Sequence, residues 1–519
     1  MSTNVKPSAS GQPALADEVV QEVSAPAAND NETLLKDIIA TNRTAILEKS
    51  RIKEDAATEQ KDFQLEIVEQ FVSEELKGSV EISSDTEAML NTRIAQLDAL
   101  LSDQLNEVMH DPKFQKLEAS WRGMHYLVDK TETDDMLRLR VLNLTKKELS
   151  RDLEKAKEFD QSELFKKVYT AEYDMFGGTP YGALIGDFEF GKHPQDIALL
   201  KNLSNVAAAA HAPFISAAAP ELFGFTSFEQ ITKERDLAAL FRGREYDKWR
   251  SFRESEDSRY VGLCMPHILL RLPYGPKTKP IESFNFDEKV DGRDSTKYLW
   301  GNAAYAMGAR ITEAFSLYGW CAAIRGVENG GLVQDLPLHT FTTDKGEIAA
   351  KCPTETLIPE RMENQLSGLG FMGLLHAKNT DFAAFFSGQS CQKPLDYMKD
   401  AASANSKLSA QLPYILMTSR FAHYLKSIAR DKIGAFMSRA ECQKWLNEWV
   451  MNYVLDMDEA SDNAKREKPL RDARIDVEDD PRRPGCYRAV AYLRPHYMLD
   501  QLTVSLRLVT ELPPQRGGS

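Results

Sequence analysis

Apolar and polar residues recur along this chain with a period that changes several times. Between residues 62 and 129 the apolar positions lie three or four apart, which predicts a series of helices. Asp111-Pro112 marks one helix start, because proline fits the first turn of a helix. From 136 to 144 the sequence MLRLRVLNL alternates with a period of two, which predicts a strand. Helical structure therefore gives way to mixed structure near residue 130.

The middle of the chain has the pattern of a parallel sheet. Residues 181–190 (YGALIGDFEF) predict a buried strand, 194–212 a helix, and 213–220 (PFISAAAP) a second strand. A helical crossover between two strands makes a βαβ unit. Further helices are predicted at 295–320, 419–437 and 440–455. We therefore expect an α/β fold, mixed with α+β regions and divided into several domains.

The C-terminal residues predict three consecutive strands, at 471–479, 486–496 and 502–513. In the last of them four apolar side chains point to one face: Leu502, Val504, Leu506 and Leu508. A strand at a chain end needs partners for its backbone groups, and the sheet edge of another chain can supply them. We therefore predict that this is an inter-subunit strand. Head-to-tail contacts of that kind build a helical filament or tube.

These patterns divide the chain into five regions. Residues 1–30 are rich in Ala, Pro, Ser and Asn, which predicts a disordered tail. Residues 31–60 contain a short helix behind that tail, whose accessible apolar face is Leu34, Leu35, Ile38 and Ile39. The other regions are a helical or linker segment at 61–130, an α/β domain at 131–380, and a C-terminal α/β domain at 381–519 that ends in a strand block at 470–512.

Composition argues against several classes of function. The 519 residues carry a formal net charge of −14 and no strong lysine and arginine cluster, which argues against nucleic-acid binding and favours protein partners. No apolar run has the length of a membrane span, and the N-terminus lacks the pattern of a signal peptide. The six cysteines form no CxxC pair, as expected for reduced thiols. We therefore expect a cytoplasmic protein without direct membrane insertion.

One stretch imitates a phosphate-binding loop. GDFEFGKH, at 186–193, matches G-x-x-x-x-G-K at Gly186, Gly191 and Lys192. His193 stands where Ser or Thr would ligate magnesium, and two acidic residues inside the loop would repel phosphate. The nine histidines include no H-x₃-H or HExxH spacing. We therefore predict no catalytic, cofactor-binding or metal site and no enzymatic activity, with a phosphate-binding α/β enzyme as an alternative.

Ten stretches of the chain stand in order between residues 62 and 514: SWRGMHYLV, RVLNLTKKELSRDLEK, FGGTPYGALIGDFEF, AAAAHAPFISAAAPELFG, LLRLPYG, LWGNAAYA, WCAAIRGVENGGLV, FFSGQSCQKP, LPYILMTSRFAHYLKSIARDKIGAFM and RRPGCYRAVAYLRPHYMLDQLTVSLRLVTELP. Together they resemble the large subunit of the type VI secretion contractile sheath. The resemblance implies the fold of contractile phage-tail sheath proteins, with terminal strands shared between neighbouring subunits. A phage-type tail sheath outside secretion is an alternative, and it would need only a single kind of chain.

The resemblance also implies partners. Family members form an obligate heterodimer with a small sheath subunit, here expected to pair with 61–130. The heterodimers polymerise as a helical sheath around an inner tube of hexameric rings, and contraction from a baseplate drives the tube into a target cell. A AAA+ ATPase then recycles contracted sheath through an N-terminal helix, for which the match is Leu34, Leu35, Ile38 and Ile39. By analogy, the tube-facing candidates are Asp456, Asp458, Glu459, Asp462, Lys465 and Arg466.

Overall fold

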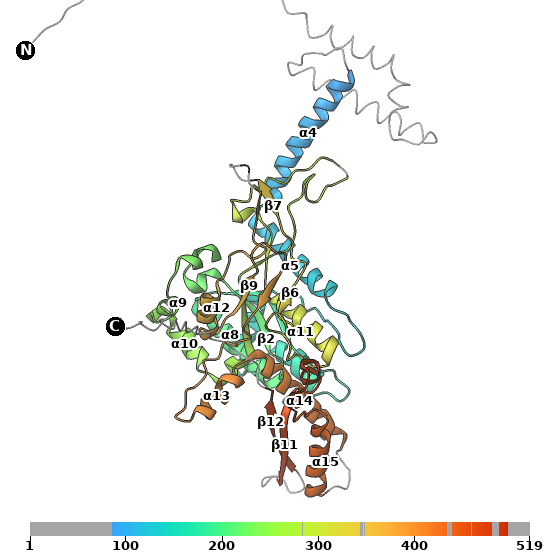
Figure 1. The fold of residues 1–519 in the computed structure, drawn as a ribbon, viewed down its shortest axis with the longest axis vertical. Coiled ribbons are helices and arrows are strands. Elements are labelled where there is room, and N and C mark those ends of the chain that lie inside the picture. Colours follow the sequence, from blue (N-terminus) through green and yellow to red (C-terminus); the bar gives the residue numbers. More distant parts are fainter. Residues whose placement is uncertain are drawn as a thin grey trace, which may run out of the picture. The chain divides into compact units, whose positions relative to one another are not determined.

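A computed structural model describes residues 86–282, 284–342, 346, 348–432, 438–457, 459–479 and 487–496, shown in Figure 1. The chain divides into two compact units, Met1–Leu97 and Asp98–Ser519. The predicted inter-subunit strand and the predicted ATPase-binding helix lie outside the described residues. The helices predicted between 85 and 130 are confirmed as α4 (Thr86–Met109) and α5 (Pro112–Asp129).

A six-stranded sheet forms the centre of the second unit, in the order β1-β2-β3-β9-β10-β6. The first four strands in this order pair in parallel, and β10 pairs antiparallel with both of its neighbours. The strands are β1 (Leu184–Phe190), β2 (Phe214–Ala218), β3 (Val261–Met265), β9 (Met372–His376), β10 (Ala383–Phe385) and β6 (Leu332–Val333). Helix α8 (Pro194–Ala210) connects β1 to β2, which confirms the predicted βαβ unit.

Helices cover both faces of this sheet. Neighbouring residues of a strand point to opposite faces, and on β2 Phe214 packs in a cluster with α8 whereas Ile215 packs in a cluster with α11 (Ala304–Tyr318). The α8 cluster is rich in aromatic rings, and the α11 cluster contains many alanines. The small side chains let α11 lie close to the sheet, as layered α/β packing requires.

Helix α11 begins later than the sequence pattern predicted. A helix was predicted from 295, but the short strand β5 (Trp300–Gly301) pairs with β4 (Ile268–Leu269), and the helix starts at Ala304. The side chain of Asn302 accepts a hydrogen bond from the backbone N–H of Ala304, at 2.8 Å. Asparagine satisfies free N–H groups at a helix start, so the local sequence Gly-Asn fixes this boundary.

The strand predicted over 136–144 is wrong as an element of a sheet. These residues are extended, but no backbone ladder joins them to another strand in the described part of the chain. Leu137 and Leu139 are half-buried and Arg138 and Arg140 are exposed, so the predicted alternation is present in the first half. Periodicity reports which side chains are buried, whereas a strand also requires a partner for its backbone.

The C-terminal region forms a third core below the sheet in Figure 1. It contains helices α14 (Leu412–Asp431), α15 (Arg439–Met451) and α16 (Asp462–Glu467), and an antiparallel hairpin of β11 (Leu470–Asp479) and β12 (Tyr487–Pro495). Both predicted helices are present, but α14 begins at Leu412 and not at 419, and residues 433–437 lie outside the described residues. The first two predicted C-terminal strands are confirmed.

The remaining elements are short. The helices are α6 (Lys146–Lys155), α7 (Glu163–Phe165), α9 (Leu237–Leu240), α10 (Asp247–Arg253), α12 (Glu360–Gly368) and α13 (Asp400–Ser409). A π-helical turn, η2, covers Lys166–Tyr173, and 3₁₀ turns cover η1 (Phe159–Gln161), η3 (Pro220–Phe223), η4 (Phe228–Lys233), η5 (Arg244–Tyr246), η6 (Glu256–Tyr260) and η7 (Ser295–Lys297). Two small hairpins pair β4 (Ile268–Leu269) with β5 (Trp300–Gly301) and β7 (Thr340–Thr342) with β8 (Ile348–Ala350).

Candidate assembly interfaces

The β11–β12 hairpin is held against the C-terminal helices by one apolar face. Alternate side chains of β11 are buried in the third core: Leu470, Ala473, Ile475 and Val477. They pack with Leu446 and Val450 of α15 and with the ring pair Trp320 and Phe421, whose centroids lie 4.5 Å apart. A two-stranded hairpin alone is marginally stable in water, so this packing makes the hairpin a fixed platform.

The outer edge of β11 is closed by two side chains of α15. The Asn447 amide donates to the carbonyl of Ile475 at 2.7 Å and accepts from its N–H at 2.9 Å. The N–H of Val477 donates to the side-chain oxygen of Gln443 at 3.3 Å. An edge strand whose backbone groups are already paired cannot accept another strand there.

The outer edge of β12 is open by comparison. Between Tyr487 and Leu493, the only backbone hydrogen bonds formed with described residues are those of the ladder with β11. The side chains of Tyr487 and Tyr492 are about half exposed. An exposed edge with unpaired N–H and C=O groups is a template for a strand from another chain. The hairpin therefore has one edge on which a further strand can add.

Helix α5 presents a row of large apolar side chains to solvent. Four residues lie three, four and seven positions apart on one face and are 39–63% exposed: Phe114, Leu117, Trp121 and Val128. The opposite face is buried at Gly123 and Leu127, and a Cβ added at Gly123 would clash with the ring of Tyr305 on α11. Exposed apolar rows of this kind mark sites of contact with another protein.

A buried ionic network holds α5 in place. Arg271, whose side chain is 5% exposed, donates to Glu118 of α5 at 2.8 Å and to Glu288 at 2.6 Å. Burial lowers the pKa of Arg271, but the hydrogen bonds to the two carboxylates outweigh it, so the net pKa is raised. Arg122 of α5 also contacts Glu118, at 2.6 Å. The exposed apolar row is therefore carried by a rigidly placed helix.

The tube-facing candidates are not equivalent in the structure. Asp456, Glu459 and Asp462 are exposed, Asp458 lies outside the described residues, and Lys465 is half-buried. Arg466 is engaged within the chain: its guanidinium donates to the Asn329 side chain at 2.9 Å and to the Glu328 carbonyl at 2.7 Å. Its charge therefore serves to hold α16, and the exposed charge of this group is acidic.

Three groups of the stretch that resembles a phosphate-binding loop are already paired within the chain. The N–H of Gly191 donates to the carboxylate of Asp196 at 2.8 Å, and Lys192 pairs with Glu245 at 2.9 Å. His193 caps the start of α8. A phosphate site needs several unpaired N–H groups around a positive centre, and here a carboxylate occupies that position. In the described part of the chain, no group of His, Cys, Asp and Glu could hold a metal ion.

A buried histidine joins three distant parts of the chain. His267 lies 2.6 Å from a carboxylate oxygen of Glu355 and 3.2 Å from one of Glu189 on β1. Burial alone lowers the pKa of His267, but the contacts with Glu189 and Glu355 outweigh it and raise the pKa to about 10. Glu355 also accepts from the N–H of Phe228, at 2.9 Å. At neutral pH the imidazolium therefore ties these segments together.

Comparison with known proteins identifies the class. Residues 91–392 match the family model "EvpB/VC_A0108, tail sheath N-terminal domain", and residues 401–512 match "EvpB/VC_A0108, tail sheath gpW/gp25-like domain". The protein is therefore a tail sheath protein. It is 53% identical over 436 residues to the type VI secretion system sheath protein TssC1 of Pseudomonas aeruginosa. The aligned residues make up 83% of this chain and 87% of that protein. The chain belongs to the tail sheath family of type VI secretion systems and is a structural subunit of the contractile sheath.

Two solved assemblies resemble the chain at a low level. One is the baseplate of the anti-feeding prophage, with a TM-score of 0.37 and 7% identity over 72% of this chain and 84% of that chain. The other is the contracted sheath complex of the extracellular contractile injection system PVC, with a TM-score of 0.30 and 8% identity over 60% and 68%. The assignment depends on the family models and TssC1, and not on these two. Among the described residues, no helix has the length and apolar character needed to cross a bilayer.

Proposed function

We propose that this subunit pairs with a small sheath subunit, polymerises into a helical tube by sharing strands with neighbouring copies, and transmits force without enzymatic activity. The observation that carries the proposal is the β11–β12 hairpin, which has one edge closed by Asn447 and Gln443 and one edge open. A polymer that must shorten without breaking needs ties that survive rotation of the subunits. Backbone ladders supply such ties, because they do not depend on any single side chain.

The incoming strand is the segment that contains Leu502, Val504, Leu506 and Leu508 of a neighbouring copy. Its alternating pattern suits a sheet with one apolar face, and the buried face of β11 and β12 is apolar. The strand adds to the open edge of β12, so each subunit accepts one strand and donates one. Such head-to-tail contacts do not close and build a tube.

Pairing with the small sheath subunit uses the exposed row of α5. Burial of a large apolar side chain stabilises a contact by about 1.5–3 kcal/mol, so the four residues of the row would supply a main part of the heterodimer contact. The helix is fixed by Arg271 and Glu118 before the partner arrives, so little ordering is needed on binding.

Recycling depends on the N-terminal helix with Leu34, Leu35, Ile38 and Ile39. A AAA+ ATPase grips its apolar face after contraction. Replacing Leu35 and Ile39 with Asp should abolish binding to the ATPase in a pull-down and leave assembly with the small subunit intact. Loss of assembly in that double variant would contradict this role.

Contact with the inner tube uses the acidic residues that precede the hairpin in the sequence. Charge reversal at Asp458 and Glu459 should shorten the sheaths and reduce co-purification of the hexameric tube protein. Unchanged sheath length and tube content would show that these acids form a solvated surface. Attachment to a baseplate and a cytoplasmic location complete the proposal.

The experiment that tests the proposal is electron microscopy of this chain co-expressed with its small subunit. Full-length chains should give tubes, and chains that lack residues 502–519 should give heterodimers without tubes. Contractile tubes from the truncated chain would contradict strand sharing. Tubes from this chain without the small subunit would favour the phage-type alternative.

A further inference from the structure

Residues 138–144 form an extended segment whose backbone is unpaired. None of its N–H or C=O groups makes a hydrogen bond with a described residue. Val141 is 72% exposed and Leu142 is 48% exposed. A run of extended backbone whose N–H and C=O groups are unpaired has the form of an edge strand. No described strand of the chain forms a ladder of backbone hydrogen bonds with this segment.

The segment is nevertheless fixed at both ends. Asp134 accepts from the N–H groups of Met136 and Leu137 at 2.7 and 2.6 Å. At the other end Thr145 and Glu148 form a capping box that starts α6. Leu139 packs with Leu127 of α5, and Leu144 packs against the α8 cluster, so these two side chains point toward the protein core. The extended conformation is therefore set before any partner binds.

The exposed side chains indicate the chemistry of a partner. Among the described residues Arg138 pairs with Asp135 alone, at 3.6 Å, and both side chains are largely solvent-exposed, so this pair contributes little. Arg140 contacts Glu172 and donates to the Thr179 hydroxyl at 3.2 Å. Val141 adds an apolar contact next to these cations. A strand that alternates apolar and acidic residues would match this surface.

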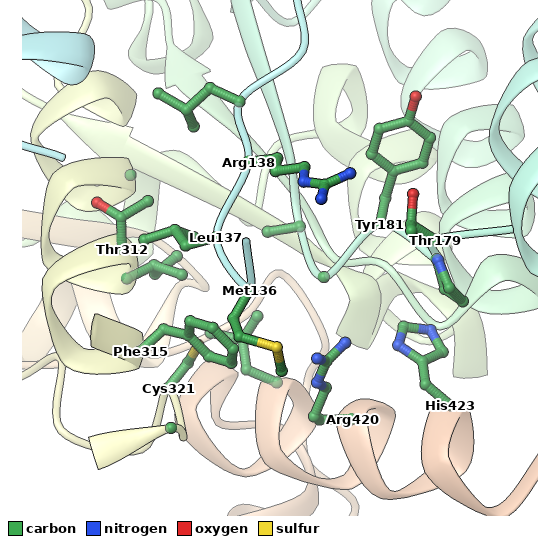
Figure 2. Close-up of a pocket in the computed structure, with 18 of the residues that line it drawn as sticks. Met136, Leu137, Arg138, Thr179, Tyr181, Thr312, Phe315, Cys321, Arg420 and His423 are labelled. Carbon is green, nitrogen blue, oxygen red and sulfur yellow. The ribbon is translucent and has the colours of Figure 1, made fainter. Parts of the chain in front are cut away.

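A cavity of about 240 Å³ lies beside the first half of the segment. In Figure 2 the side chain of Met136 extends toward Arg420 and Phe315 at its wall. The guanidinium of Arg420 lies 5.5 Å from the ring centre of Phe315, and its Nε has no hydrogen-bond partner in the described part of the chain. The cavity can therefore take an apolar side chain and place an acidic group against Arg420.

We propose that residues 138–144 accept a strand of the small sheath subunit, which adds by backbone hydrogen bonds and inserts one side chain into this cavity. The inference rests on the pairing proposed above. It favours the small subunit over a second copy because Leu139 of the segment packs with Leu127, which directly precedes Val128, the last residue of the exposed row, so the segment lies next to the end of that row. A strand of a second copy already has its place at β12.

Hydrogen exchange of the backbone amides tests this directly. The probe is the small sheath subunit, co-purified with the full-length chain as the unassembled heterodimer. A strand that adds to one edge protects every second amide, so alternate amides of 138–144 should exchange at least about tenfold more slowly than in the free chain. If the heterodimer forms but the amides of 138–144 stay unprotected, strand addition at this segment is wrong, and the proposed pairing with the small subunit is unaffected. Absence of a heterodimer would overturn both.

Protection that arises only in assembled tubes would assign the segment to a second copy and would also overturn the inference. Two proline variants provide a matched pair, because Val141 and Leu142 are both exposed and their N–H groups point to opposite edges. One of V141P and L142P should weaken the heterodimer at least about tenfold, and the other should have a much smaller effect. Equal effects of the two would count against a backbone ladder. Thermal unfolding of each free variant reports whether it is folded.

Discussion

Asn447 of α15 holds both backbone groups of Ile475 in β11, with its amide nitrogen 2.7 Å from the carbonyl oxygen and its amide oxygen 2.9 Å from the N–H nitrogen. The side chain of Asn447 thus makes the two backbone hydrogen bonds that a residue of a neighbouring strand would make. The consequence is directional: β11 is closed and β12 stays open, so a sheet built from several copies can grow from one side of the hairpin only.

Replacing Asn447 with Leu should open the β11 edge. Two backbone groups lose their partners, and we expect the free energy of unfolding to fall by about 1–3 kcal/mol. The freed edge should also promote irregular association. Urea denaturation and size-exclusion chromatography measure the two effects. Asn405→Leu is the matched control, because Asn405 is exposed on α13. Equal behaviour of the two variants would contradict a capping role.

Replacing Trp121 with Glu should weaken pairing with the small subunit and leave the chain folded. Trp121 is 63% exposed in the described chain, so its removal costs little stability. At a partner surface a tryptophan contributes about 2 kcal/mol or more, which is roughly thirtyfold in affinity. Binding assays with the purified small subunit measure the loss. Ile348→Glu, at an exposed position in β8, is the control. Unchanged affinity for the Trp121 variant would remove α5 from the interface.

Replacing His267 with Gln should destabilise the protein in a pH-dependent way. The pKa of His267 is raised to about 10 in the folded chain from its ordinary value of 6.5, so its stabilising contribution is complete below pH 6.5 and declines as the pH rises toward 10. We expect a loss of about 3 kcal/mol near neutral pH. The difference between variant and wild type should shrink between pH 7 and 10 in denaturation experiments. A difference that grows over this range would contradict a charged His267.

Replacing Lys192 with Ala should change neither stability nor nucleotide binding. The pair with Glu245 is exposed at both ends and contributes about 0.5 kcal/mol or less. Calorimetric titration with ATP and magnesium should give no signal for either protein. Binding to the wild type that disappears in the variant would revive the phosphate-binding alternative.

Periodicity along the chain predicted the elements but not their partners. The crossover from β1 through α8 to β2, the helices α14 and α15, and the hairpin all follow from which side chains are apolar at period 3.6 or 2. The same reasoning made 136–144 a strand of a sheet, because its side chains alternate. It gave no sign that the backbone there lacks a ladder.

The sites that define the interfaces join residues far apart in the chain. Glu189, His267 and Glu355 meet at a single ionic contact, and the sequence pattern, which placed Glu189 in the predicted strand 181–190, gave no sign that His267 and Glu355 would lie beside it. Asn447 and Gln443 are polar residues inside the helix predicted at 440–455, and in the structure both pair with β11. No local signal could have found these contacts, because each depends on the order of the strands and the packing of helices against them.

Family membership and the succession of helices and strands were thus accessible from residue order alone, since both are written in short stretches of the chain. Which edge is closed, which helix face stays exposed and which extended segment is unpaired required the folded chain. The physical reason is that a side-chain pattern is set by burial within one element, whereas hydrogen-bond partners are set by the elements that pack beside it.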